Sequence, residues 1–174
     1  LDIIEKHGAD ALRFTLLSLI SSGKDIKFSD QRLEGYRNFM NKIWNATRFS
    51  LSNLSDFKET EQSLPPKETL SLADKWLTFR LGQVEDEVQD ALENYRFSDA
   101  TTALYQFVWN DFCDWYLEYT KPIVYGNNAG EKKATQMVLA VTLNRIMRLM
   151  HPFVPFITEE IYQKLPIKSK ALVI

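Results

Sequence analysis

The strongest pattern in the chain is an apolar stripe between residues 28 and 54. Its members recur every three or four residues: Leu33, Tyr36, Met40, Ile43, Trp44, Thr47, Leu51 and Leu54. Because an α-helix turns about 100° per residue, this spacing lines up along one face of a long helix. Ser29 is placed to cap its first turn, and Phe28 is placed to pack against Leu33. The stripe therefore predicts a helix that buries one face along its whole length.

The opposite side of this predicted helix carries Asn38, Lys42, Asn45 and Phe49, again spaced by three or four. Amides and an ammonium group hydrogen-bond to base edges, and an aromatic ring is a surface on which an unstacked base can stack. The set is therefore suited to reading single-stranded RNA. A second helix covering this side would instead make Phe49 ordinary core and the asparagines contacts between helices. Spacing alone leaves both interpretations open.

Other stretches of helical period predict further helices. They lie at residues 9–21, 71–95, 98–119, 131–150 and 158–165. No stretch alternates as a half-buried strand does, and the polar stretch at 55–70 contains Pro65-Pro66 and is expected to be a loop. The predicted fold is all-α: an up-and-down helical bundle preceded by a short helix.

Capping residues and prolines predict where these helices begin and end. Ser71, Ser98 and Thr158 are expected to cap the helices that start at them, and Pro122 is expected to stop the 98–119 helix. The 71–95 helix is expected to bury Trp76, Val84, Val88, Leu92 and Tyr95. The next helix is expected to place an aromatic cluster in the core: Trp109, Phe112, Trp115 and Tyr116.

Composition and residue counts exclude several classes of protein. With 174 residues, 45% hydrophobic and 25% charged, the chain is long and apolar enough for one folded domain with its own core. No run approaches the roughly 20 apolar residues of a membrane span, and the first residues form no signal sequence, so we expect a cytoplasmic protein that contacts no membrane. The chain lacks an initiator Met and ends without a finished element, which indicates a piece truncated at both ends.

The sequence offers little to a metal ion. A single cysteine, Cys113, excludes an internal disulfide and a multi-cysteine zinc site, and it is expected to be a buried apolar group. Three carboxylates share a helical face at Asp111, Asp114 and Glu118, but a di-metal helical site also needs Glu-x-x-His pairs that the chain lacks. We expect these acids to pair with arginines such as Arg13, Arg145 or Arg148, and we expect no metal.

Charge is distributed unevenly along the chain. The net charge is −2, which is not the footprint of a generic nucleic-acid binder. Residues 24–54 hold six basic and three acidic residues, whereas residues 56–118 hold five basic and fourteen acidic residues. Residues 119–174 are basic again, with eight basic and three acidic residues. Phosphate contacts are therefore expected near the 28–54 helix or in the last third of the chain.

Several long blocks of sequence together resemble the valyl-tRNA synthetase family. They are GADALRF at 8–14, GKDIKF at 23–28, QRLEGYRNFMNKIWNATRF at 31–49, ALENYRFSDATTALYQFVWNDFCDWYLEYTKP at 91–122 and HPFVPFITEEIYQKLP at 151–166. The first and last blocks also resemble the leucyl and isoleucyl enzymes. The 31–49 block is the one that indicates valine.

The resemblance implies a role for each part of the chain. Residues 29–166 would be the helical anticodon-binding domain, residues 1–28 a helix and linker at the junction with the catalytic domain, and residues 167–174 the start of a further segment. The catalytic and editing sites of the family lie in segments absent here, so the chain would hold no catalytic residue and no cofactor. ATP and Mg²⁺ would serve the full-length enzyme. Its partners would be the tRNA anticodon stem-loop and its own catalytic domain, and the piece itself would be monomeric.

The resemblance also assigns candidate residues. Phe49 would stack on an anticodon base, and Lys42 and Asn45 would donate hydrogen bonds to the middle and last bases, beside Asn38.

Two further groups of candidates surround that set. Arg32, Arg37 and Arg48 would contact phosphates or bases, with salt bridges to the acidic helices as the alternative. Asp10 and Arg13 would lie at the domain junction, with a local ion pair as the alternative.

Three other functions remain as alternative interpretations of the sequence. The nearest is the anticodon-binding domain of an isoleucyl- or leucyl-tRNA synthetase. A helical protein-interaction module would use the same exposed face for a protein, and its binding would be less sensitive to salt than RNA binding. A free-standing metal enzyme would contain stoichiometric metal.

Overall fold

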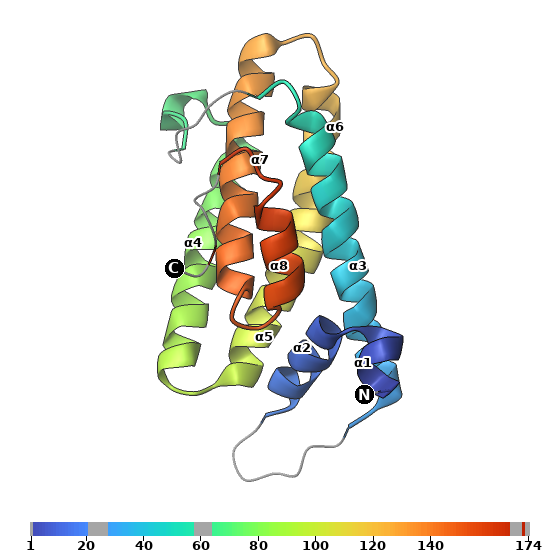
Figure 1. The fold of residues 1–174 in the computed structure, drawn as a ribbon. Coiled ribbons are helices and arrows are strands. Elements are labelled where there is room, and N and C mark those ends of the chain that lie inside the picture. Colours follow the sequence, from blue (N-terminus) through green and yellow to red (C-terminus); the bar gives the residue numbers. More distant parts are fainter. Residues whose placement is uncertain (1, 21–27, 58–63, 168–171, 173–174) are drawn as a thin grey trace.

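The computed structural model describes residues 2–20, 28–57, 64–167 and 172, and the elements in these ranges are all helical (Figure 1). The first part of the chain forms α1 (Asp2–His7), α2 (Ala9–Leu19) and α3 (Asp30–Asn53). The second part forms η1 (Lys67–Thr69), α4 (Leu72–Glu93), α5 (Phe97–Gln106), η2 (Phe107–Tyr116) and α6 (Leu117–Val124). The last part forms α7 (Ala129–Met150) and α8 (Pro155–Tyr162). None of these helices is both long and apolar enough to cross a membrane.

The long helices alternate in direction, as an up-and-down bundle requires (Figure 1). α5, η2 and α6 form one continuous rod. α3 and α4 lie on opposite sides of the bundle, and each packs against this rod and against α7. The short helices α2 and α8 contact each other near one end of α3. The all-α bundle that the sequence predicts is confirmed.

The long helix α3 has the predicted cap and the predicted buried face. The Ser29 side chain accepts a hydrogen bond from the Arg32 amide at 3.3 Å. Leu33, Met40 and Ile43 are buried in the core, as the apolar stripe predicted. The structure adds Phe39, which is fully buried although it lies outside that stripe.

The start of α4 was predicted correctly, but part of its buried face was not. Ser71 and Asp74 form a capping box, and the second carboxylate oxygen of Asp74 accepts a hydrogen bond from the buried Tyr116 hydroxyl at 2.7 Å. Val84 and Val88 are buried as expected, whereas Trp76 is 39% exposed and Tyr95 is 79% exposed. Tyr95 follows the helix end with a left-handed φ of 57°, so the stripe of α4 does not extend to it.

Two predicted boundaries of the next helix are wrong. Ser98 does not cap α5, because the helix begins one residue earlier and Arg96 stands at the cap position, where it forms ion pairs with Asp90 and Asp99. Pro122 does not stop the rod, since α6 continues to Val124 with the proline inside it. Burial of the neighbouring apolar residues outweighs the backbone hydrogen bond that a proline cannot make.

The middle of the rod explains a wrong burial prediction. Over η2 the backbone adopts i→i+5 hydrogen bonding, seen where the Leu117 amide bonds to the Phe112 carbonyl. The wider turn shifts the buried positions away from the spacing of an ordinary helix. Phe112 and Tyr116 are buried as expected, and their rings stack on each other, but Trp115 is 72% exposed.

The first turn of α8 is capped by a side chain from another helix. It begins at Pro155, three residues before the predicted Thr158 cap, and Thr158 is buried inside it. The carboxylate of Asp10, on α2, accepts hydrogen bonds from the amides of Phe156 at 3.3 Å and Ile157 at 2.7 Å. Proline at the first helical position has no amide to satisfy, so Asp10 serves the two that follow.

We expect Asp10→Ala to lower the free energy of unfolding by about 1–3 kcal/mol, because two amides at the start of α8 lose their acceptor. Urea denaturation of the chain measures the change. Asp10→Asn, which keeps one acceptor oxygen, should lose less. Asp86→Ala removes an exposed carboxylate on α4 and should change stability by less than about 0.5 kcal/mol. Equal losses for the Asp10 and Asp86 variants would contradict this capping role.

Candidate nucleic-acid interface

The outer face of α3 is a continuous polar stripe. Its exposed members recur at three- and four-residue spacing: Asn38, Asn41, Asn45, Arg48 and Ser52. Asn38, Asn45 and Arg48 were predicted from the sequence. Asn41 was missed, although its place between two exposed asparagines at helical spacing was a sufficient signal. Together these side chains present hydrogen-bonding groups over about four turns of the helix.

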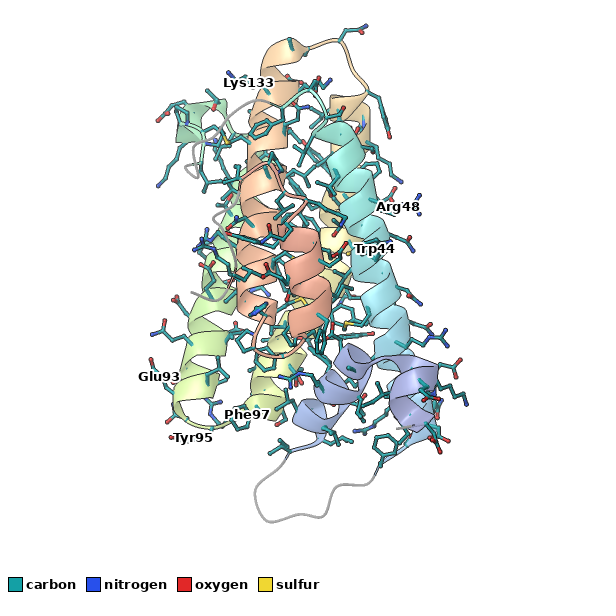
Figure 2. The ribbon with its side chains drawn as sticks, viewed as in Figure 1. Trp44, Arg48, Glu93, Tyr95, Phe97 and Lys133 are labelled. Carbon is teal, nitrogen blue, oxygen red and sulfur yellow. The ribbon has the colours of Figure 1, made fainter. Side chains whose placement is uncertain are left out.

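The three arginines of α3 are exposed and available to a ligand. Among the described residues, the guanidinium groups of Arg32, Arg37 and Arg48 form no ion pair, so the alternative of salt bridges to the acidic helices is wrong. The fold gives the reason. The acidic α4 lies across the bundle from α3, and the rod carboxylates of Asp111, Asp114 and Glu118 pair with Arg80, Lys42 and Lys121. Figure 2 shows Arg48 extending outward from α3.

Phe49 lies at the seam between α3 and α6. Its position is intermediate between the exposed surface and the buried core. Its ring is half-buried and packs against the core cluster. The ammonium nitrogen of Lys121 lies 5.9 Å from the ring centroid, and Glu118 holds that ammonium group at 2.6 Å. The ring therefore keeps an accessible part but has less free surface than the sequence suggested.

Lys42 is not the free donor that the sequence predicted. Its ammonium nitrogen lies 2.5 Å from the Asp114 carboxylate and 3.9 Å from the centroid of the Trp109 ring. Both contacts reach from α3 to η2, so Lys42 ties the two helices together. An exposed ion pair and a cation–π contact contribute about 1 kcal/mol each at most. A role of Lys42 in RNA binding stays a prediction, and it would require Lys42 to give up at least the Asp114 contact.

The neighbouring carboxylates pair with cations other than those predicted. Asp111 pairs with Arg80 at 3.2 Å and Glu118 pairs with Lys121. Arg145 instead pairs with Glu85. In the described part of the chain, no three His, Cys, Asp or Glu side chains are grouped as they would be to hold a metal ion.

Asp10 binds the first turn of α8, and Arg13 binds the turn between α7 and α8. The Arg13 guanidinium donates to the carbonyl oxygens of Pro152 at 3.0 Å and Phe153 at 3.1 Å. Asp10 is 8% exposed, and burial raises the pKa of its carboxyl while the amides of Ile157 and Phe156 oppose that rise. Their partners within this chain are therefore backbone groups. A role at a junction with another domain stays a prediction.

A separate apolar hollow lies on the acidic side of the bundle. It has a volume of about 580 Å³ and is lined mainly by Leu72, Ala73, Trp76, Trp115, Tyr116 and Tyr119 of α4, η2 and α6. Most of its wall is contributed by residues in the segment that carries excess negative charge. Phosphate groups would be repelled there, so this hollow is not part of the candidate RNA surface.

Comparison with known proteins identifies the family. Residues 74–173, which include most of α4, all of α5 to α8 and more than half of the chain, match the family described as the anticodon-binding domain of tRNA ligase. The chain belongs to this family.

The relatives of this anticodon-binding domain include bacterial valine-tRNA ligases. The enzyme of Bdellovibrio bacteriovorus is 65% identical over 99% of this chain and 20% of its own length. Those of Geobacter sulfurreducens and Thermotoga maritima are 48% and 46% identical, over 94% and 100% of this chain and 18% and 19% of their own lengths. The chain thus spans about one fifth of the curated relatives it matches. These alignments include α3, which precedes the residues of the family match.

Solved structures show the same fold at low sequence identity. LeuRS of Agrobacterium radiobacter K84, in a ternary complex with tRNA and LeuAMS, superposes with a TM-score of 0.69 at 20% identity, over 94% of this chain and 19% of that one. Apo methionyl-tRNA synthetase of Mycobacterium tuberculosis superposes with a TM-score of 0.72 at 19% identity, over 92% and 33%. This anticodon-binding domain therefore has a bundle that these synthetases share.

Cys113 of the anticodon-binding domain should be chemically inert. Burial raises the pKa of its thiol to about 12, beyond the opposing effect of Lys42. At pH 8 only about one thiol in ten thousand would be ionised, against a substantial fraction for an ordinary cysteine. We expect iodoacetamide to label the folded chain at least a hundredfold more slowly than the urea-unfolded chain, as measured by mass spectrometry. Rapid labelling of the folded chain would show that the thiol is not buried in this way.

Proposed function

We propose that this chain is the anticodon-binding domain of a valine-tRNA ligase and that it binds the anticodon stem-loop through the outer face of α3. The observation that carries the proposal is the exposed stripe of asparagines and Arg48 on α3, with the exposed Arg37 beside it. Neither guanidinium group forms an ion pair with the described residues. Amide groups suit base edges and free guanidinium groups suit phosphates. A half-buried ring at Phe49 borders the same face and offers an edge for stacking.

The rest of the reaction belongs to other domains of the full-length enzyme. ATP and Mg²⁺ would bind there, and valine would be joined to tRNA there, in the cytoplasm where translation occurs. The contribution of this domain is positional, because binding energy at the anticodon orients the distant acceptor end of the tRNA. We infer that four side chains contact the RNA with little rearrangement, because they are already exposed: Asn38, Asn41, Asn45 and Arg48.

The alternatives differ from this proposal in what they would bind. A leucyl or isoleucyl domain would prefer another anticodon, and the valine-tRNA ligase alignments through α3 favour valine over both. A protein-interaction module would lose little affinity as salt is raised, whereas RNA binding weakens steeply.

The proposal is tested by tRNA binding to the full-length protein that contains this chain. We expect a tRNA with a valine anticodon to bind at least tenfold more tightly than the same tRNA with its middle anticodon base changed, since a base contact contributes about 1–3 kcal/mol. Filter binding at fixed salt measures the ratio. Equal affinities would show that the anticodon is not read.

Substitution of Arg48 tests whether this exposed arginine contacts a phosphate or a base of the tRNA. We expect Arg48→Ala to weaken tRNA binding by roughly five- to tenfold in the full-length protein, with no change in melting temperature, because its guanidinium forms no ion pair with the described residues. If Arg48 contacts a phosphate, the slope of log affinity against log salt falls by roughly one. Lys75→Ala removes an exposed cation of α4 and is the matched control. Equal binding by both variants would remove Arg48 from the interface.

A further inference from the structure

The turn that follows α6 carries an exposed aromatic side chain beside the candidate interface. Tyr125 is the C-cap of α6 and is 69% exposed. Its hydroxyl forms no hydrogen bond with the described residues. Its amide bonds to the Lys121 carbonyl at 3.1 Å, so its backbone continues the helix by one residue. An aromatic ring held outward on an ordered backbone is a rigid contact surface.

Two contacts along the seam between α3 and the rod join residues that are equally far apart in the sequence. Lys42 pairs with Asp114, and Phe49 lies beside Lys121, and the members of each pair are 72 residues apart. The two helices therefore run parallel over this stretch. One turn beyond the Phe49–Lys121 contact, the same register places Tyr125 level with Asn53, the last residue of α3.

Helix geometry also gives the side on which Tyr125 lies. It is one turn, about 6 Å, beyond Lys121 and rotated by about 40° around the axis of α6. This rotation is toward Glu118, which is exposed, and away from Leu117 and Val124, which are buried. Tyr125 thus extends the outer side of the seam on which Phe49 and Lys121 already lie.

We propose that Tyr125 is a second stacking surface for the anticodon loop, on which a nucleobase next to the one at Phe49 rests. This inference depends on the proposed function and extends its surface from α3 across the seam to α6. Lys121 lies between the two rings, where a cation can accompany the backbone that joins the two bases. Near Tyr125 the basic residues Lys121, Lys132 and Lys133 balance the acidic residues Asp56, Glu118 and Glu131, so this end of the bundle lacks the acidic excess of α4.

A second exposed tyrosine, Tyr95, lies outside the candidate interface and allows a comparison with Tyr125. Tyr95 is 79% exposed but lies at the turn between α4 and α5, at the opposite end of the bundle (Figure 2). Residues near it in the sequence include Asp90, Glu93 and Asp99, of which Asp90 and Asp99 pair with Arg96, so three carboxylates stand against one cation. Tyr95 therefore has the same chemistry and similar exposure in an acidic setting, which makes it the matched control.

The test uses the full-length protein and a tRNA with a valine anticodon that carries 2-aminopurine at each anticodon-loop position in turn. Stacking on a tyrosine quenches the fluorescence of this base. We expect one position to be quenched by wild-type protein and by Tyr125→Phe but not by Tyr125→Ala. Tyr125→Ala should also weaken binding of unlabelled tRNA by about tenfold, whereas Tyr95→Ala should not. All variants should melt at the wild-type temperature.

The outcomes separate this inference from the proposed function. Phe49→Leu, which removes the ring but keeps apolar volume, tests the α3 face. If Phe49→Leu and Arg48→Ala weaken binding while Tyr125→Ala does not, the second stacking surface is absent and the α3 interface stands. If Tyr125→Ala weakens binding but changes the fluorescence at no loop position, the side chain does not stack and the inference is wrong. If the protein ignores the anticodon base altogether, both proposals fail.

Discussion

The parallel packing of α3 against the η2–α6 rod is the constraint on which the candidate interface depends. It buries the apolar stripe of α3 and leaves the opposite stripe of asparagines and arginines in solvent. It also places Phe49 at the edge of the contact, where the ring both packs against the core and retains some accessible surface. A small rotation of α3 would either bury that ring or expose the stripe that stabilises the bundle.

The same packing separates the charges of the domain. The acidic α4 is on the side away from α3, so the arginines of α3 are not neutralised by it. At the seam itself the lysines are used internally, with Lys42 bound to Asp114 and Lys121 to Glu118. An acidic protein can therefore present a surface suited to RNA, because the charge that matters is the local one. The arginines supply positive charge, whereas Lys42 joins α3 to η2 and the ion pair of Lys121 lies within α6.

Two side chains of α2 join this helix to the bundle through hydrogen bonds to backbone atoms. Asp10 accepts hydrogen bonds from amides at the start of α8, and Arg13 donates to carbonyls in the turn before it. These contacts fix α2 relative to α8 and the turn before it, between residues that are 139 to 147 positions apart in the chain.

The sequence by itself determined the helices, their principal buried faces and the polar stripe of α3, because these follow from periodicity and local capping at Ser29 and Ser71. It could not determine which polar side chains would be free, since the partners of Lys42 and Arg13 come from distant segments. It also placed Trp115 in the core, because an extrapolated 3.6-residue period does not anticipate the wider turns of η2. The cap of α8 by Asp10, the pairing of Lys42 with Asp114 and the half-buried position of Phe49 were decided only by the tertiary structure. Each of them depends on the distance between helices, which no local pattern encodes.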